Sequence, residues 1–479
     1  MAKNLIGADW KDASDKAVIK ITNPATGELI DTVPESTKQD CNMAVQAARK
    51  GQKNWVKRPI HERAKILMKF VDLVEKHKDE LAKLLSDETG KPITEAYGEI
   101  ANVGIGVPAF CEMAKHMYGN VIPKGQEMGQ ENTLQYTTQA PLGVVVAIIP
   151  FNFPSDLFCQ KIPPALLMGN AVIMKPSPHN PLTLNRYAEL LLEAGVDKGA
   201  INVINGTGGF AAQALAANPG VNLVSLTGAT KSGIETMNTC SANLTHLMLE
   251  LGGNDAFILD KDGDVDLAVE ETIWGRFYNT GQVCCASKRF LIHNAVKDEY
   301  IKKLKARIAK IKRGMPSDPK VQLGCLVSEQ AAKNVEKQVN QTVAEGAKII
   351  LGGKRDGAFY DPTILDGVTK DMPVAKDMEI FGPVVSIIGF DDIKEAIRIA
   401  NQSSFALCAC IITRNMNNAF KISEQLEAGG VIINGASFFR SFEMPFGGWK
   451  YSGIGNEGIM TTLKEMSRTK TVILKNIFK

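Results

Sequence analysis

A continuous apolar segment at 142–150, LGVVVAIIP, constrains the fold more than any other part of the chain. A strand without polar alternation is expected where both faces of a sheet are covered, as in parallel α/β sheets. Four further short apolar strand patterns follow, at 171–175, 201–204, 223–226 and 256–259. Helical patterns such as those at 182–195 and 210–217 separate them, so the alternation predicts a doubly wound parallel sheet.

A second α/β series follows the turn Leu251-Gly252-Gly253, where we place a domain boundary. The chain has 479 residues, too many for a single hydrophobic core. Strands of this second series are predicted at 289–293, 348–351, 384–388, 407–412 and 430–434. Its helices are predicted at 264–278, 296–313 and 328–345.

The flanking segments have a different texture. Helical periodicity covers 38–90 and 94–118, and short strands surround a Pro/Gly turn at 20–30. The Thr-containing segment 132–140 is extended in character, as an edge or bridging strand would be. The tail at 469–475 reads as a terminal strand that has to pair with another strand.

Four polar segments are predicted at the ligand-binding edge of the first sheet, because ligands of such sheets bind at the carboxyl ends of the strands. They are Asn152 with its neighbours, Lys175-Pro176-Ser177, Gly206-Thr-Gly-Gly and Thr227-Gly228. A lysine there suits a ribose hydroxyl or a phosphate, and a helix N-terminus suits a pyrophosphate. Each segment alone is equally consistent with a solvated strand end, a simple turn or an ordinary capped helix.

A thiol stands in a polar, glycine-containing turn, Asn279-Thr-Gly-Gln-Val-Cys284-Cys285-Ala286. Cysteine is a strong nucleophile when it has thiolate character and access. Gly281 would let the backbone bend close to a substrate. The alternative is a pair of buried free cysteines that pack as small apolar residues.

Two further side chains could serve such a nucleophile. Glu250 lies between apolar residues and a Gly-Gly turn, and an apolar setting makes a carboxylate a usable general base. Asn152 lies in Pro150-Phe-Asn-Phe-Pro, where its amide could stabilise an oxyanion by about 3 kcal/mol. A strand-end glutamate facing water and a plain Asn-Phe-Pro turn are the alternatives.

Several function classes are excluded by the sequence. A net charge of +3 and the lack of a basic block argue against nucleic acid or a membrane as partner. Nine cysteines without ligand spacing predict no metal site, and an odd count without a signal segment predicts a reduced, cytoplasmic protein. The run Gly453-Ile-Gly-Asn-Glu-Gly458 matches a dinucleotide fingerprint by letters only, since no buried strand precedes it.

Seven segments together resemble the NAD(P)-dependent aldehyde dehydrogenase superfamily of the non-acylating type. They occur in the family's order and spacing across essentially the whole chain, which makes the set specific where one motif would be weak. They are Pro150-Phe-Asn-Phe-Pro, Lys175-Pro-Ser, Thr227-Gly-Ala-Thr-Lys-Ser-Gly, Glu250-Leu-Gly-Gly, Gly281-Gln-Val-Cys284, Glu379-Ile-Phe381-Gly-Pro and Pro445-Phe-Gly-Gly-Trp-Lys-Tyr-Ser-Gly.

The resemblance implies oxidation of an aldehyde to the carboxylic acid. Cys284 would attack the aldehyde to give a thiohemiacetal, and Asn152 with the Cys284 N–H would hold the oxyanion. Hydride transfer to the nicotinamide would leave a thioester that Glu250-activated water hydrolyses. Glu457 matches a second acidic position behind the active site that assists proton relay in relatives.

The resemblance also implies a cofactor, NAD or NADP. Lys175 and Glu379 are predicted at the ribose hydroxyls and Phe381 beside the nicotinamide. The full set of predicted cofactor residues is Pro150, Phe151, Lys175, Ser177, Pro178, Gly208, Thr227, Gly228, Ala229, Gly233, Leu251, Glu379 and Phe381. Three positions depart from the family pattern. Pro178 replaces a glutamate typical of NAD-preferring members, so NADP becomes tolerable. Ala229 replaces a serine near the pyrophosphate, and Asn456 stands where arginine is common.

The substrate is expected to be a small aldehyde. Its predicted contacts are Phe153, Leu157, Tyr278, Cys285, Arg440 and Phe446. Arg440 lies among aromatic residues on the loop that lines the tunnel in relatives, and a buried arginine needs an anionic partner. An anionic aldehyde of the lactaldehyde, semialdehyde, phosphono- or sulfo-aldehyde kind would supply one. The alternative is an arginine that is exposed or paired with Glu443, and Tyr278 argues mildly against succinate semialdehyde.

Two rival functions remain open. A CoA-acylating enzyme would share the cysteine chemistry, although retention of Glu250 favours hydrolysis. A non-catalytic structural protein would be expected to lack Cys284, Asn152 or Glu250.

The implied architecture is an aldehyde-dehydrogenase-like α/β fold. A Rossmann-type cofactor domain is expected over 1–118 and 142–251, and a catalytic domain over 252–450. A bridging β-arm, at 119–141 and 468–479, is expected to pair between subunits in a homodimer or homotetramer.

Overall fold

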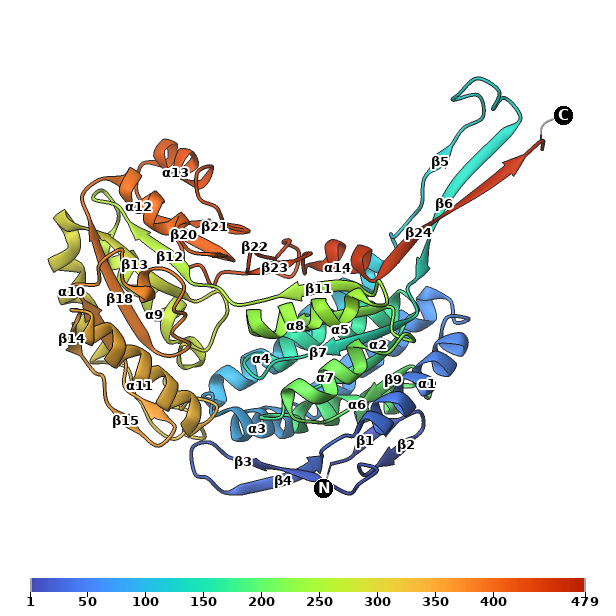
Figure 1. Cartoon of the computed structure of the whole chain (residues 1–479), viewed down its shortest axis with the longest axis horizontal. Helices are drawn as coiled ribbons and strands as arrows, with labels where there is room; N and C mark the ends of the chain where they lie inside the picture. Colours follow the sequence, from blue (N-terminus) through green and yellow to red (C-terminus); the bar gives the residue numbers. More distant parts are fainter. Residues whose placement is uncertain (1, 478–479) are drawn as a thin grey trace.

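The structure, a computed structural model, describes residues 2–477, and of Gly208 only its place at the start of a helix. Residues 478–479 of the predicted arm lie outside this range. Two α/β lobes lie side by side, and a narrow β-arm projects from one of them (Figure 1).

The first lobe is built on an eight-stranded sheet in the order β2-β1-β9-β8-β7-β10-β11-β23. Its strands are β1 (Asn4–Ile6), β2 (Asp9–Lys11), β7 (Val144–Ile148), β8 (Ala171–Lys175), β9 (Ile201–Val203), β10 (Leu223–Thr227), β11 (His246–Glu250) and β23 (Gly453–Ile454). The five strands from β7 to β11 are parallel, and four of them, β7 to β10, were predicted. The strand β11 was not predicted, and the strand predicted at 256–259 belongs to the second sheet instead. From β7 the chain builds β8 and β9 on one side and then returns to β10 and β11 on the other. A topological switch point therefore lies between β7 and β10, where such sheets bind ligands.

Helices cover both faces of this sheet, which explains the continuous apolar run. Val144 and Val146 of β7 pack in one core cluster with α1, α7 and α8, whereas Val145 and Ala147 pack in another with α2, α4, α5 and α6. The helices of this lobe are α1 (Lys38–Trp55), α2 (Ile60–Lys76), α3 (Lys78–Thr89), α4 (Ile93–Ala114), α5 (Pro154–Leu167), α6 (Leu182–Ala194), α7 (Gly208–Ala216) and α8 (Thr230–Ser241). The single helical pattern predicted over 38–90 is thus three helices.

The second lobe is built on a seven-stranded sheet in the order β14-β17-β18-β13-β12-β20-β21. Its strands are β12 (Asp255–Leu259), β13 (Ser287–His293), β14 (Lys348–Leu351), β17 (Thr363–Asp366), β18 (Val384–Phe390), β20 (Cys408–Ile412) and β21 (Gly430–Ile433). Its helices are α9 (Val265–Phe277), α10 (Asn294–Ile308), α11 (Glu329–Ala344), α12 (Ile393–Asn401) and α13 (Met416–Ser423). The chain passes from the first sheet to the second between Glu250 and Asp255, around the predicted Gly-Gly turn.

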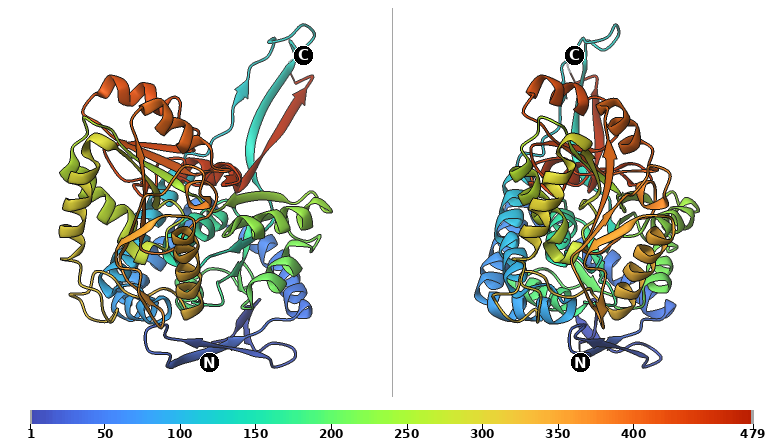
Figure 2. Two further views of the ribbon diagram at one scale, coloured as in Figure 1. Left: turned by 60° about the vertical axis from the view of Figure 1, so that its left-hand side comes forward. Right: turned by 90° about the vertical axis from the view of Figure 1, so that its left-hand side faces the viewer.

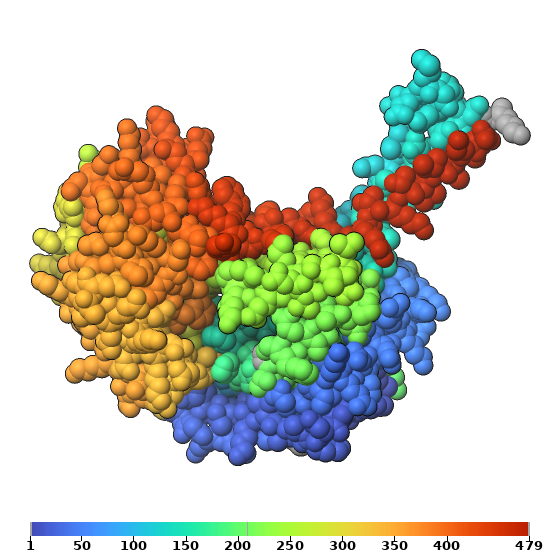
Figure 3. Space-filling model, in the orientation of Figure 1, coloured from blue at the N-terminus to red at the C-terminus, as the bar shows by residue number. Residues whose placement is uncertain are grey.

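The arm is a three-stranded antiparallel sheet in the order β24-β6-β5. It consists of β5 (Val121–Ile122), β6 (Thr133–Pro141) and the terminal strand β24 (Ser467–Lys475), which pairs with β6 from Ser467↔Pro141 to Lys475↔Thr133. The terminal strand, which was predicted to need a partner, therefore pairs with β6 of the same chain. The arm stands away from the body in every view and leaves β5 and β24 as edges (Figures 2 and 3).

Smaller elements join the lobes. The hairpin of β3 (Val18–Thr22) and β4 (Leu29–Pro34) lies below both lobes in Figure 1. In the C-terminal segment, β22 (Trp449–Lys450) pairs with β19 (Phe405–Ala406), β23 pairs antiparallel with β11, and α14 (Ile459–Glu465) leads into the arm. A further short hairpin joins β15 (Arg355–Asp356) to β16 (Phe359–Tyr360). The letters Gly453–Gly458 are thus an edge strand and a helix start, in line with their rejection as a dinucleotide fingerprint.

Candidate active site

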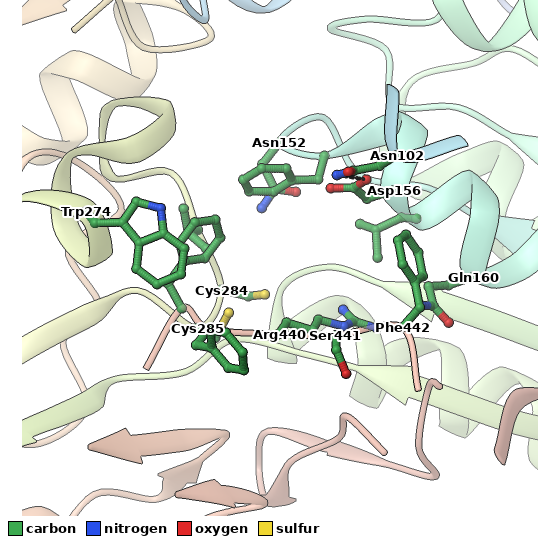
Figure 4. Close-up of a pocket in the computed structure, with 15 residues that line it drawn as sticks. Asn102, Asn152, Asp156, Gln160, Trp274, Cys284, Cys285, Arg440, Ser441 and Phe442 are labelled. Atoms are coloured by element: carbon green, nitrogen blue, oxygen red, sulfur yellow. Dashed lines mark hydrogen bonds between the residues drawn. The ribbon is translucent and has the colours of Figure 1, made fainter. Parts of the chain in front are cut away.

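A cavity of about 290 Å³ is lined by residues of both lobes, and the Cys284 and Cys285 sulfurs face it (Figure 4). Most of its wall is apolar, with Val283, Leu157 and five aromatic residues: Phe153, Trp274, Phe438, Phe439 and Phe442. The polar wall residues are Asn102, Asn152, Asp156, Gln160, Arg440 and Ser441. Four predicted substrate contacts, Phe153, Leu157, Cys285 and Arg440, therefore reach the cavity.

Tyr278 and Phe446, also predicted as substrate contacts, do not line this cavity. The Tyr278 ring stacks behind the wall, on Phe153 with ring centroids 6.1 Å apart and beside Phe438 at 5.1 Å. The Phe446 ring lies under the Arg440 guanidinium at 4.0 Å. Both side chains therefore support residues of the cavity wall. Their rings are covered by Phe153, Phe438 or Arg440 and do not reach the cavity.

The nucleophile turn adopts an unusual backbone. Asn279, Thr280 and Gly281 have φ values of 48°, 55° and 75°. Left-handed conformations at non-glycine residues cost of order 1 kcal/mol each, so surrounding contacts have to hold them. The Asn279 N–H donates to Glu95 at 2.8 Å, and the Gln282 side chain links the Asn279 carbonyl to the Val327 N–H.

Gly281 serves a different contact from the one predicted. A Cβ there would lie 2.4 Å from the carbonyl oxygen of Gly382. The glycine therefore allows close approach to the loop after Phe381 rather than to a substrate.

Asn152 is aimed by a network that the sequence did not reveal. Its backbone carbonyl accepts hydrogen bonds from Lys91 Nζ and from Asn279 Nδ2, each at 2.9 Å. Lys91 also pairs with the buried Glu99, which accepts the Ser155 N–H at 2.7 Å. The Asn152 side-chain amide donates to no acceptor within residues 2–477, so it is free to meet an oxygen in the cavity. This rigid, available donor goes beyond a simple Asn-Phe-Pro turn.

Cys284 and Glu250 affect each other's protonation. Hydrogen bonding to Cys285 and burial raise the pKa of Cys284 well above its ordinary value, and Lys288 acts in the opposite sense. Burial, followed by the nearby Cys284 and Glu457, raises the pKa of Glu250 well above its ordinary range. Glu250 is only 3% exposed, and neither of its carboxyl oxygens has a hydrogen-bond partner among the described residues. Glu250 therefore does not face water as a strand-end residue would.

Behind Glu250 lies an ion triad of Lys161, Glu457 and Arg440. The Glu457 carboxylate accepts from Lys161 Nζ at 2.8 Å and from Arg440 Nη2 at 2.9 Å. Burial opposes ionisation of Glu457, but the two cations hold its pKa below the ordinary value. Arg440 is thus paired with Glu457, and the predicted alternative pairing with Glu443 is wrong. Because two cations share one anion, the triad keeps a net positive charge beside the cavity.

The predicted cofactor residues gather along the carboxyl edge of the first sheet. Lys175 ends β8, and Thr227 and Glu250 end β10 and β11. The Lys175 ammonium is 2% exposed, and it makes no hydrogen bond or ion pair within the described part of the chain. Burial lowers its pKa to about 8. The buried Thr227 hydroxyl is likewise unpartnered. Unpaired polar groups of this kind fit a ligand with hydroxyl and phosphate oxygens.

The α8 N-terminus completes this edge. Ala229 is its N-cap and supplies no side-chain hydrogen bond, so the first N–H groups of α8 remain available to a phosphate. Gly233 allows close packing, since a Cβ there would lie 2.7 Å from Leu251. Ser177 accepts the His179 N–H at 3.2 Å, and Pro178 lies between them. The molecular surface is hollowed beside α7 and α8 (Figure 3).

The remaining cofactor residues lie across this edge. Phe151, which follows Pro150, makes an edge contact with Phe381 at 6.0 Å between ring centroids. The Glu379 carboxylate lies against Gly252, where a Cβ would come within 2.6 Å of it, and its Oε1 forms an ion pair with Lys288 Nζ at 3.2 Å. Of Gly208 only the place at the start of α7 is described. The residues present thus fit a dinucleotide that spans the two lobes.

Residues 2–477 contain neither a metal-ligand cluster nor a membrane-spanning helix. No cluster of three or more His, Cys, Asp or Glu side chains is arranged to hold a metal ion. No helix in that range is long and apolar enough to cross a membrane.

Known proteins resemble this chain over nearly its whole length. Residues 10–472 match the model of the Aldehyde dehydrogenase family. A 3-sulfolactaldehyde dehydrogenase of Priestia aryabhattai is 37% identical over 469 residues, which cover 98% of this chain and 97% of that protein. An NADP-dependent succinate-semialdehyde dehydrogenase of Escherichia coli is 36% identical, over 95% of this chain and 94% of its own. The structure of a betaine aldehyde dehydrogenase of Staphylococcus aureus in complex with NAD+ superposes with a TM-score of 0.95 at 32% identity, covering 100% of this chain and 98% of that chain.

Proposed function

The chain belongs to the aldehyde dehydrogenase family and oxidises aldehydes with NAD or NADP, and we propose that Cys284 is the nucleophile of this reaction. The supporting observation is that the Cys284 thiol and the free Asn152 amide share one cavity, and that the buried Glu250 carboxyl lies close enough to Cys284 for the two groups to affect each other's pKa. The raised pKa of Cys284 means that the resting group is a thiol. Glu250, in its ionised form, is the base that takes the thiol proton.

Each chemical step then uses a group in the cavity. The thiolate attacks the aldehyde carbon, and the oxyanion of the thiohemiacetal accepts hydrogen bonds from the Asn152 amide and the Cys284 N–H. The bound nicotinamide supplies the hydride acceptor. The thioester on Cys284 is hydrolysed by a water molecule from which Glu250 removes a proton, and the acid leaves.

The dinucleotide is held by the residues at the sheet edge. Lys175 and Glu379 would bind ribose hydroxyls, the α8 N-terminus and Thr227 would bind the pyrophosphate, and Phe381 would contact the nicotinamide. Pro178 carries no charge that would repel a 2′-phosphate, so NADP is accepted along with NAD.

Hydrolysis is favoured over CoA acylation. A buried, unpartnered carboxyl next to the thiol is the feature that hydrolysis needs, and Glu250 has both properties. A purely structural role would leave no reason for a strained turn and a free amide at one cavity.

The substrate we propose is a small aldehyde with an anionic end. The cavity is narrow and aromatic, and the net positive charge of the Lys161–Glu457–Arg440 triad is its electrostatic feature. Relatives are named for sulfolactaldehyde and succinate semialdehyde, both of which are small and anionic. The Asp156 carboxyl on the same cavity opposes an anion when ionised, and burial raises its pKa to about 7.

The arm suits pairing between subunits. Among the described residues its two edge strands have no partner on their outer sides, and the arm exposes apolar side chains, with Val121 68% and Ile473 55% accessible. We therefore propose a homodimer or homotetramer assembled through 119–141 and the C-terminal strand. The cofactor unit is then 1–118 with 142–251, the catalytic unit is 252–450, and nine free cysteines suit a cytoplasmic location.

A cofactor-reduction screen tests the function. The purified chain is mixed with NAD or NADP and with anionic, neutral and aromatic aldehydes, and absorbance of the reduced cofactor is followed. Cys284→Ser is expected to abolish turnover with every aldehyde, and Cys408→Ser, a buried cysteine off the cavity wall, is the matched control. Arg440→Leu should lower kcat/KM on anionic aldehydes more than on neutral ones. Equal losses on both would refute the anionic substrate. In a parallel reaction with added CoA, acyl-CoA as the product in place of the free acid would refute hydrolysis.

A further inference from the structure

We propose that Lys288 is a positioning residue that ties the nucleophile turn to the ribose-side carboxylate Glu379. The inference rests on the proposed function, because it takes Cys284 and Glu379 as working groups. Lys288 is the second residue of β13, four residues after Cys284. Neither a sequence motif nor a cavity contact singled it out.

The Lys288 ammonium makes one hydrogen bond and one ion pair, both to functional residues, and it also lies 5.9 Å from the centre of the Phe381 ring. Its charge acts on the buried Asp255 as well, whose pKa it lowers against the effect of burial. Lys288 Nζ donates to the backbone carbonyl of Cys284 at 2.5 Å and lies 3.2 Å from Glu379 Oε1. The Lys288 side chain is 1% exposed, so these groups replace water as its partners. Burying an ammonium is costly unless it is paired, which makes a purely incidental placement unfavourable.

The Gly252-Gly253 turn encloses the same bridge from the other side. A Cβ at Gly252 would meet the Glu379 carboxylate at 2.6 Å, and a Cβ at Gly253 would meet the Cys284 carbonyl oxygen at 2.9 Å. The two glycines therefore lie directly against the two acceptors that Lys288 joins. Three separate motifs, at 250–253, 281–284 and 379–381, converge on one lysine.

This geometry has two consequences. Holding the Cys284 carbonyl fixes the backbone at Cys284 and with it the direction of the thiol. The positive charge also favours the Cys284 thiolate. At the other end, Lys288 holds the Glu379 carboxylate on the cofactor side, where it would accept ribose hydroxyls.

The test measures thiol reactivity in the enzyme without cofactor or aldehyde. Iodoacetamide alkylation of Cys284 is followed from pH 6 to 12 by peptide mass spectrometry in the wild type and in Lys288→Met, because the Cys284 pKa lies well above the ordinary thiol value. Met keeps the length of the side chain and removes the charge. We expect the alkylation midpoint of Lys288→Met to rise by about one pH unit. We also expect the Kd for NADPH, measured by fluorescence, to rise several-fold.

Two controls make the outcome decisive. Lys297→Met removes a lysine that pairs with Asp366 in the same lobe, at 2.6 Å, and should leave both readouts unchanged. Glu379→Gln leaves the Lys288 charge unpaired. That charge then favours the Cys284 thiolate more strongly, so the alkylation midpoint of Cys284 should fall in this variant. Even if Lys288→Met does not fold, an unchanged midpoint in Glu379→Gln overturns the proposal, as does an unchanged midpoint in folded Lys288→Met. Loss of aldehyde oxidation by the wild type would instead count against the proposed function, since alkylation does not depend on turnover.

Discussion

Replacing Glu457 with Gln should have two separable effects, on stability and on the pH dependence of hydrolysis. The substitution leaves the Lys161 ammonium, whose side chain is 1% exposed, without an anionic partner, since the Ser225 hydroxyl at 2.9 Å and the new amide oxygen are both neutral. Removing one partner of a buried ion pair costs roughly 3–5 kcal/mol. Because Arg440 is 24% exposed and can turn to solvent, we expect the lower end of that range, about 3 kcal/mol.

The second effect concerns the base. Glu457 raises the pKa of Glu250, whereas Arg440 lowers it. In Glu457→Gln the like charge is gone and both cations remain, so the pKa of Glu250 should fall. At an effective dielectric constant near 20, the repulsion between two unit charges within roughly 12 Å of each other corresponds to about one pH unit or more. Since ionised Glu250 is the active base, the acid limb of the hydrolysis rate should move to lower pH.

Two assays separate the effects. Denaturant unfolding followed by circular dichroism gives the change in stability, compared as midpoints because two lobes need not unfold in one step. The steady-state rate after a pre-steady-state burst of NADPH reports hydrolysis between pH 5 and 9. In Lys161→Met/Glu457→Gln the orphan ammonium is gone, and most of the lost stability should return. An acid limb that stays in place or moves to higher pH would refute the electrostatic coupling.

Three further predictions follow from single positions. With an anionic aldehyde, kcat/KM of Asp156→Asn divided by kcat/KM of the wild type should rise several-fold from pH 6 to 8. The wild-type carboxyl, with a pKa of about 7, ionises over that range and then repels the substrate. A constant ratio would show that Asp156 does not face the anion. Pro178→Glu should lower kcat/KM for NADP about tenfold more than for NAD, because a carboxylate repels the 2′-phosphate; equal losses would place the 2′-phosphate elsewhere. In Gly119→Ala the new Cβ would lie 1.6 Å from the Thr137 carbonyl oxygen, so the arm should be displaced and sedimentation should show a smaller assembly; an unchanged assembly would exclude the arm from the subunit contact.

The architecture was largely predictable because its signals are local. The apolar run at 142–150 and the next three strand patterns correctly predicted β7 to β10, since a strand covered on both faces needs apolar residues throughout. The strand β11 was missed, and the fifth predicted strand, at 256–259, is β12 of the second sheet. The tail strand was predicted as well. The antiparallel β1–β2 hairpin beside β9 was missed, because three-residue strands carry too short a pattern.

The supporting residues of the site were not predictable in the same way. Lys161 offered one usable signal, an ammonium within the apolar sequence of α5, whose burial requires an anion. Its partner Glu457 lies 296 residues away, and nothing local links the two. Arg440 was correctly suspected of needing an anion, but the chain supplies that anion itself, in Glu457. Long-range pairing of this kind is visible only in the folded chain.

The path of the C-terminal segment has a consequence for biosynthesis. Gly453 pairs with Glu250, the Ser452 carbonyl accepts the Leu251 N–H at 2.9 Å, and Ser452 Oγ donates to the Gly252 carbonyl at 2.7 Å. The base, its turn and the Lys161 counter-ion are thus completed by residues translated some two hundred positions after Glu250. A ribosome-bound chain can fold much of its first lobe while the thiol still lacks a positioned base. The reactive centre is therefore complete only when nearly the entire polypeptide has been synthesised. A nascent or truncated chain lacks the contacts that position the base, so its cysteine is not activated.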